Sequence, residues 1–278
     1  MNVLKAVEIW LGYHKAHSKK NTVRAYESIL FKLCREFDKR RLNELSTNDL
    51  LSFLNRITIG KKSSTKRVRY AHLLAFFNFC KDNLVPDLKN PCDSPMLRQL
   101  FRATSSPYWD FIEKETIDEI IFRTTKIRNR LILELMARGG MRIGEVLKLT
   151  PDDISDQKLI QRDPKSGREN EIVFIPKRVA ERLKEYARSA CKNADDLLFP
   201  ISYEAARVIV AKAGKMVEIK LRPHDLRRHA ATYASRAGVP IEVVSKVILR
   251  HSNLSTTQRY IGKISETEAM SWIDNLYR

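Results

Sequence analysis

The chain has 278 residues, of which 43% are apolar and 30% charged, and this length and composition are typical of a globular protein with two domains of ordinary size. Its apolar runs are far too short for a membrane span, and its N-terminus has no secretory signal. The four cysteines are too scattered for a disulfide framework or a zinc site. We therefore expect a cytoplasmic protein that binds neither a membrane nor a metal.

The charge of the chain is strongly positive. A formal net charge of +18 and an isoelectric point near 9.8 predict a polyanionic partner, usually nucleic acid, although a solvated surface rich in lysine and arginine is the alternative. Residues 1–106 carry 20 Lys and Arg against 9 Asp and Glu, a net charge of +11. Residues 107–278 carry 31 against 24, a net charge of +7. The shorter segment is the more basic one, as expected of a segment that binds phosphates.

The N-terminal part of the chain reads as a series of helices. Apolar residues recur at helical spacing over residues 21–37, and a serine followed three residues later by an aspartate predicts the capped start of a short helix at Ser46. A third helix, over residues 63–83, is basic at its start and apolar later. This basic start could lie along a DNA backbone, or it could be an ordinary solvated helix end. Its basic residues are Lys66, Arg67 and Arg69.

Prolines and hydrophobic periodicity divide the rest of the chain. Four prolines and little periodicity between residues 83 and 107 predict a linker over 91–106, with a helical DNA-binding domain over 1–90 before it and a second domain over 107–278 after it. The second domain alternates helical runs with one β-hairpin, whose central turn contains Lys165. We expect a mainly α fold, in which the second domain is mostly helical with a small β-hairpin or sheet.

Four short segments of the second domain carry the residues suited to DNA chemistry. They are GGMRIGEVLKL (139–149), DPKSGRENEIVFIP (163–176), RPHDLRRHAATY (222–233) and ILRHSNLSTTQRYIGKI (248–264). Together they resemble the tyrosine recombinase family, which includes the Xer proteins, the phage integrases and Cre. One of these segments alone would be a weak signal, but their order and the nine-residue interval from His251 to Tyr260 make the set specific. The resemblance extends to the N-terminal helices, which are similar to the core-binding domain of the family.

Arginine suits the charge that develops during cleavage of a phosphodiester. Its planar guanidinium donates two parallel hydrogen bonds to the non-bridging oxygens of a phosphate. The resemblance implies that Arg142 and Arg227 are the two catalytic arginines. Glu145 follows Arg142 by one helical turn and could orient it, or it could be an ordinary surface carboxylate.

A tyrosine is a poor nucleophile at neutral pH, because the reference pKa of a phenol is roughly 10, unless nearby cations favour its deprotonated form. The resemblance implies that Tyr260 is the nucleophile, His224 the general base and His251 a hydrogen-bond donor to the phosphate. Lys165, at the hairpin turn, is the expected general acid. The phosphotyrosyl bond conserves the energy of the phosphodiester, so we expect no metal, ATP or other cofactor. The alternatives to Lys165 are Lys158, Arg162 and Arg168.

One position departs from the family pattern. The family usually has glycine before the second histidine, and Arg250 stands there in this chain. It could add a DNA phosphate contact, or it could mean that the local turn differs. The last residues, 265–278, predict a C-terminal helix. The resemblance implies that this helix docks into a neighbouring protomer, and packing back on its own domain is the alternative.

The resemblance implies a function for the whole chain. We expect a site-specific recombinase that cleaves double-stranded DNA through a 3′-phosphotyrosyl intermediate. It would act as a homo-tetramer on paired inverted half-sites, with its two domains clamping the duplex, and a monomer in solution is compatible with this. Its role would be Xer-like or that of a mobile-element integrase. The alternatives are a DNA-relaxing enzyme of the type IB topoisomerase kind and a DNA-binding regulator that no longer cleaves.

Overall fold

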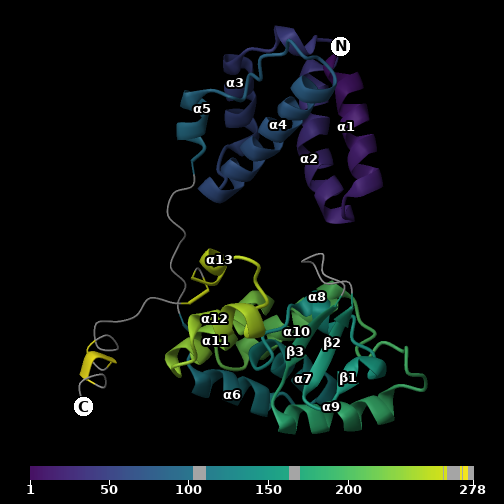
Figure 1. The fold of residues 1–278 in the computed structure, drawn as a ribbon, viewed down its shortest axis with the longest axis vertical. Helices are drawn as coiled ribbons and strands as arrows, with labels where there is room; N and C mark the ends of the chain where they lie inside the picture. Colours follow the sequence, from purple (N-terminus) through teal and green to yellow (C-terminus); the bar gives the residue numbers. More distant parts are fainter. Residues whose placement is uncertain (103–110, 163–169, 259, 262–269, 271, 275–278) are drawn as a thin grey trace. The chain divides into compact units, whose positions relative to one another are not determined.

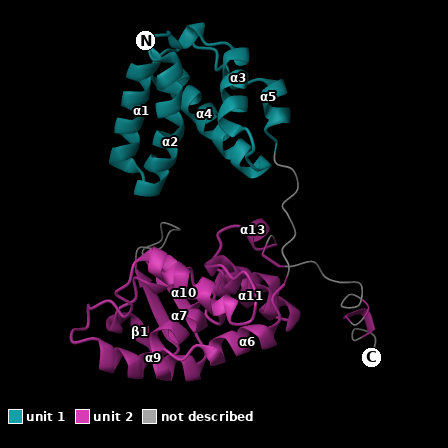
Figure 2. Cartoon of the chain, turned by 180° about the vertical axis from the view of Figure 1, so that it is seen from behind, with its two compact units in different colours: residues 1–106 teal, residues 107–278 magenta. Residues whose placement is uncertain are grey.

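The computed structural model describes residues 1–102, 111–162, 170–258, 260–261, 270 and 272–274 (Figure 1). The chain forms two compact units, Met1–Ser106 and Pro107–Arg278 (Figure 2). The described residues are mostly helical, with a small three-stranded sheet in the second unit. The predicted fold class, mainly α with a small β component, is confirmed.

Unit 1 is a bundle of helices around an aromatic-rich core. Its predicted helices are present as α2, α3 and α4, and the start of α3 is capped as expected, because the Asp49 amide donates to Ser46 Oγ at 3.2 Å. Trp10 of α1 and Phe76 of α4 meet edge to face in the core. The elements of unit 1 are α1 (Val3–His17), α2 (Lys20–Phe37), η1 (Leu42–Glu44), α3 (Thr47–Thr58), α4 (Ser63–Asn83) and α5 (Pro95–Leu100).

The beginning of the expected linker is a folded part of unit 1. Pro95 lies in the first turn of α5, where a missing amide proton costs nothing. The side chains of Cys92, Leu97 and Phe101 are buried in the core of the unit. The hydroxyl of Tyr70 also donates to the Cys92 carbonyl at 3.0 Å. Burial of these apolar side chains therefore extends the first unit past three of the four prolines that suggested a linker.

Unit 2 is built around the buried helix α7. Every side chain of α7 from Leu131 to Ala137 is buried, and the helix packs against α9 and α11. The predicted hairpin is confirmed as the antiparallel pair β2 and β3, in which Gln161 lies opposite Glu171. The turn between these strands, with Lys165, lies outside the described residues. The order of elements is α6 (Lys114–Arg123), α7 (Ile127–Ala137), α8 (Ile143–Val146), η2 (Pro151–Asp153), β1 (Ile154–Ser155), β2 (Lys158–Arg162), β3 (Asn170–Phe174), α9 (Lys177–Ala190), α10 (Tyr203–Lys215), α11 (Pro223–Arg236), α12 (Ile241–Val243), η3 (Val244–Ile248) and α13 (Leu254–Gln258).

A tight turn allows two distant segments of unit 2 to approach each other. Gly140, between α7 and α8, has φ +61°, a conformation that disfavours L side chains. A Cβ at this position would lie 2.8 Å from the carbonyl oxygen of Ile248, at the end of η3. Glycine therefore allows the α7–α8 turn to approach the segment that leads to His251.

Substituting Gly140 by alanine should lower the free energy of unfolding by about 1–3 kcal/mol, the cost of holding an L residue in a sparsely populated backbone region. Gly144→Ala is the matched control, because nothing lies within 4 Å of an added Cβ there. It should be neutral or stabilise α8 by up to about 1 kcal/mol. Urea unfolding followed by circular dichroism measures both effects, and a Gly140→Ala variant as stable as the wild type would contradict this view of the turn.

Candidate active site

Arg142 and Glu145 form a reciprocal pair at the start of α8. Arg142 is the residue immediately before the helix, and its amide donates to Glu145 Oε2 at 2.8 Å. Its Nη1 also donates to Glu145 Oε1 at 2.6 Å. The carboxylate of Glu145 is buried, whereas about a third of the Arg142 side chain (32%) is exposed. Glu145 is therefore not an ordinary surface carboxylate, and it holds both the backbone and the guanidinium of Arg142.

Burial and neighbouring charges shift the pKa of the Glu145 carboxyl in opposite directions. Burial by itself would raise the pKa of its carboxyl. The positive charges of Arg250 and Arg142, together with the hydrogen bond from the Arg142 amide, outweigh this and lower the pKa. Glu145 is therefore ionised at neutral pH and serves as a fixed negative charge between two arginines.

Arg227 lies in α11 and is fully buried. Its Nη1 donates to the Gly140 carbonyl and its Nη2 to the Leu249 carbonyl, so the guanidinium joins the α7–α8 turn to the end of η3. Burial, followed by repulsion from Arg142 and Arg250, lowers the pKa of Arg227 to about 9. The side chain thus stays charged at neutral pH. In this structure its terminal nitrogens bind backbone carbonyls, although the sequence predicted a phosphate contact for them.

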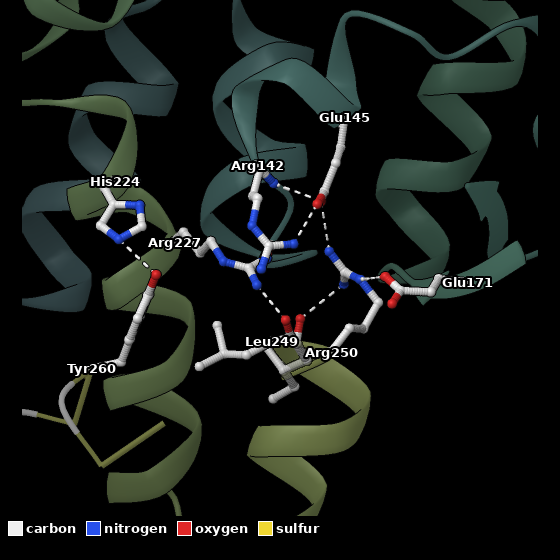
Figure 3. A network of polar contacts seen from close by, with 10 residues as sticks. Arg142, Glu145, Glu171, His224, Arg227, Leu249, Arg250 and Tyr260 are labelled. Carbon is white, nitrogen blue, oxygen red and sulfur yellow. Dashed lines mark hydrogen bonds and ion pairs between the residues drawn. The ribbon is translucent and has the colours of Figure 1, made fainter. Parts of the chain in front are cut away.

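Arg250 does not lie on an open DNA-facing surface. Its side chain is buried, with Nη2 2.8 Å from Glu145 Oε2 and Nε 3.5 Å from Glu171 Oε2 (Figure 3). Its Nη1 donates to the Ile248 carbonyl at 2.9 Å. Its φ is +52°, in the left-handed region where glycine is favoured. The structure thus differs from the expected phosphate contact, because two buried carboxylates draw the guanidinium inward.

Tyr260 lies in the site of its own chain, between two histidines. Its Oη is 2.6 Å from His224 Nε2, a hydrogen-bond distance (Figure 3). The His251 ring approaches it edge to face, with 4.9 Å between the ring centroids. The Thr232 hydroxyl donates to the Tyr260 carbonyl at 3.0 Å, which attaches the tyrosine to α11. The sequence motif therefore brings together the histidines and the tyrosine that it predicted.

A chain of hydroxyl groups supports His251, and the sequence did not reveal it. His251 Nδ1 lies 2.9 Å from Thr257 Oγ1, and this hydroxyl donates to Ser245 Oγ at 2.8 Å. Thr257 and Ser245 are both buried. The available signal for this support was Thr257, which lies on the short helix α13, because a helix can bury one face and with it a hydroxyl group.

Desolvation and the positive charge of the site together keep both histidines neutral. Partial desolvation, followed by the charges of Arg228, Arg227 and Arg142, lowers the pKa of His224 to about 4, although its side chain retains contact with solvent. Burial, followed by repulsion from Arg227 and Arg142, lowers the pKa of His251 to about 4. Both imidazoles can therefore accept a proton at neutral pH.

The remaining predicted site residues belong to unit 1 and to the segment from β2 to β3. In unit 1, Arg67 is exposed and Lys66 is half-buried, whereas Arg69 donates to the Ile57 carbonyl at 2.6 Å. Among the candidates for the general acid, Lys165 and Arg168 lie outside the described residues. Lys158 is exposed on β2, and Arg162 pairs with the buried Asp153 at 2.8 Å.

A metal site and a membrane-spanning helix are both absent from the described residues. Among the residues that the structure describes, no group of three or more His, Cys, Asp or Glu side chains could hold a metal ion. In the same part of the chain, no helix is long and apolar enough to cross a membrane.

Comparison with known proteins gives the family. A sequence model described as the phage integrase family matches residues 110–266, more than half of the chain. The chain belongs to the phage integrase family. The predicted resemblance to tyrosine recombinases and the predicted enzyme class are confirmed.

Two tyrosine recombinases resemble this member of the phage integrase family over most of its length. A tyrosine recombinase of Pseudothermotoga lettingae is 27% identical over 266 residues, which cover 91% of both chains. Tyrosine recombinase XerA of Pyrococcus horikoshii is 27% identical over 253 residues, covering 87% of this chain and 82% of XerA.

Solved structures show the same fold. The Tn1549 transposon integrase in complex with transposon right end DNA has a TM-score of 0.76 at 18% identity, over 100% of both chains. A lambda integrase dimer bound to a COC′ core site has a TM-score of 0.75 at 15% identity, over 94% of this chain and 95% of that one.

The neutral histidines make stability depend on pH. In the unfolded chain His224 and His251 titrate near the ordinary value of 6.5, whereas in the folded chain each has a pKa of about 4. The unfolded state therefore binds more protons between these values, and the free energy of unfolding should fall as the pH drops from 6.5 towards 4.

A His224→Gln/His251→Gln variant should show a flatter pH dependence in urea unfolding between pH 7 and pH 5. Some dependence will remain, because the pKa values of His14, His72 and His229 are lowered as well. A double variant whose stability changes with pH as steeply as that of the wild type would show that these two histidines are not held neutral.

Proposed function

We propose that the chain is a site-specific DNA recombinase that cleaves and rejoins strands through a 3′-phosphotyrosyl intermediate on Tyr260. The observation that carries this proposal is the 2.6 Å distance between Tyr260 Oη and His224 Nε2, in a site whose arginines repel protons from the histidine. A neutral imidazole at hydrogen-bond distance is the acceptor that a phenol needs in order to become a nucleophile.

Double-stranded DNA is the proposed partner. The net charge of +18 supports a polyanion, and the greater basicity of residues 1–106 supports a DNA-binding role for unit 1, with the exposed Arg67 as a phosphate contact. The Tn1549 and lambda integrases that share the fold are described in complex with DNA. XerH recombinase, at 19% identity and a TM-score of 0.70, is described as bound to a palindromic difH substrate. A palindrome is a pair of inverted half-sites, which supports the same arrangement here.

Cleavage begins with transfer of the Tyr260 proton to His224. Tyr260 Oη then attacks the phosphorus, a bond from Oη to phosphorus forms, and the bond to the 5′ oxygen breaks. Lys165 is the proposed general acid that gives the departing oxygen its proton. The 5′ hydroxyl of another strand reverses these steps, so one phosphodiester is exchanged for another and the balance of bonds requires neither ATP nor a metal.

Arg142 and Arg227 have different parts in this proposal. The partly exposed Arg142 can donate directly to a non-bridging phosphate oxygen, because Glu145 takes only its Nη1. Arg227 holds the backbone carbonyls of Gly140 and Leu249. Its direct contact with the phosphate, which the family resemblance implies, requires part of that guanidinium to leave these carbonyls when DNA binds.

His251 is the further phosphate donor that the resemblance implies. Because its Nδ1 faces the Thr257 hydroxyl, which itself donates to Ser245, this role requires its Nε2 to take up a proton when the phosphate brings negative charge to the site.

Strand exchange is proposed to occur in a tetramer on two sites, as the resemblance implies. The biological role that we propose, either Xer-like or recombination of a mobile element, follows from the same resemblance. Similarity to a tyrosine recombinase named XerA, over 87% of this chain and 82% of XerA, supports the Xer-like form.

Tyr260→Phe should retain DNA affinity and lose all covalent protein–DNA adduct. The substrate is a nicked duplex carrying a half-site that the Tyr260→Phe protein selects from a randomised duplex pool, and adducts are resolved on a denaturing gel. Tyr203→Phe is the matched control, because Tyr203 is an exposed tyrosine of α10 outside the site. An adduct formed by the Tyr260→Phe protein would contradict the assignment of the nucleophile.

Plasmid assays distinguish the proposed recombinase from a topoisomerase and from a DNA-binding regulator. A recombinase should exchange strands between two plasmid-borne copies of the selected site and leave a supercoiled plasmid without the site unchanged. Relaxation of the site-free plasmid would instead indicate a topoisomerase. Binding without any nicking would indicate a DNA-binding regulator.

A further inference from the structure

Arg250 has an unfavourable backbone conformation, and the contacts of its side chain must compensate for the cost in free energy. A φ of +52° is sparsely populated by L residues other than asparagine and aspartate, and such residues persist where the surrounding structure holds them. Arg250 is also buried, so its charge requires partners. An unusual backbone and a buried charge at the residue next to His251 point to a specific role for the guanidinium.

The guanidinium of Arg250 is held by groups from three different elements. It donates to Glu145 Oε2 at 2.8 Å and to the Ile248 carbonyl at 2.9 Å, and its Nε forms an ion pair with Glu171 Oε2 at 3.5 Å (Figure 3). The two carboxylates are almost as buried as Arg250, with 8% and 5% of their side chains exposed. Glu171 balances the charge of Arg250, whereas Glu145 also contacts Arg142.

Glu145 is the point at which the two arginines meet. Its Oε1 accepts from Arg142 Nη1, and its Oε2 accepts from both the Arg142 amide and Arg250 Nη2. With Oε2 engaged in this way, the carboxylate contacts the guanidinium of Arg142 with one oxygen only. Without Arg250, Glu145 would be free to turn both oxygens towards that guanidinium, in the paired geometry that carboxylates and arginines favour. That pairing would take away donors that a phosphate needs.

We propose that Arg250 is a positioning residue for cleavage, which holds Glu145 so that the partly exposed Arg142 keeps its remaining guanidinium donors for the DNA phosphate. The inference rests on the proposed function, since it assigns Arg142 to the phosphate. Arg250 does not touch the phosphate itself. It takes the place of the family's glycine and connects the residue before His251 to the start of α8.

The experiment separates positioning from stability by removing the charge that Arg250 balances. Arg250→Met has a side chain of similar length and keeps the positive φ of the backbone, but it removes the cation that pairs with the buried Glu171 in the described part of the chain. The thermal stability of this variant should therefore fall. Adding Glu171→Gln neutralises that carboxylate and should recover much of the stability. The informative comparison is therefore Arg250→Met/Glu171→Gln against Glu171→Gln alone.

In that comparison we expect the rate of adduct formation on the selected nicked duplex, at saturating DNA, to fall roughly tenfold to a hundredfold, as it does when a partner that orients a site ligand is removed. DNA affinity should not change. Arg250→Lys/Glu171→Gln should recover much of the rate, because an ammonium can still hold Glu145 Oε2. Arg182→Met is the matched control, since Arg182 pairs with the buried Glu134 on two helices, α9 and α7, that carry none of the proposed catalytic residues. It should lower stability and leave the rate unchanged.

Adduct formation by Arg250→Met/Glu171→Gln at the rate of Glu171→Gln would overturn the positioning role and leave Arg250 a structural residue. A lysine variant as slow as the methionine variant would also overturn it, because a positive charge would then not be what holds Glu145. Failure of the wild-type chain and of Glu171→Gln to form any adduct would instead count against the proposed function.

Discussion

Three arginines lie close together in the second unit, two of them buried and Arg142 partly exposed, and the contacts around them keep them charged there. A buried guanidinium is costly unless acceptors surround it. The acceptors are the carboxylates of Glu145 and Glu171 and the carbonyls of Gly140, Ile248 and Leu249. They come from α8, β3, the α7–α8 turn and the end of η3, so satisfying the arginines requires these distant segments of sequence to meet.

The same concentration of charge sets the chemistry of the neighbouring residues. The arginines help to hold His224 and His251 neutral and leave a proton acceptor beside the phenol of Tyr260. Phosphate brings negative charge to a place where positive charge is in excess. A site that disfavours extra protons and favours an anion is suited to generating a phenolate and receiving a phosphodiester. The fold and the proposed reaction thus depend on a single electrostatic arrangement.

Much of this could be predicted from the sequence, because local patterns determine it. Apolar spacing indicated α2 and α4, and the motif spacing indicated that His251 and Tyr260 act together. The first helix, α1, was not among the predicted elements, although its buried side chains also recur at helical spacing. The sequence could not show where long-range contacts direct a side chain. An arginine next to a histidine suggested a phosphate contact, but Arg250 is held by acidic residues about 80 and 105 positions earlier in the chain.

The central claim is that Tyr260, activated within its own chain, becomes covalently attached to DNA. Mass spectrometry of the peptide recovered from a nuclease-trimmed adduct tests this most directly. The account predicts a nucleotide joined through its 3′ phosphate to the side-chain oxygen of Tyr260. A 5′ linkage, or a nucleotide on any other residue, would contradict it.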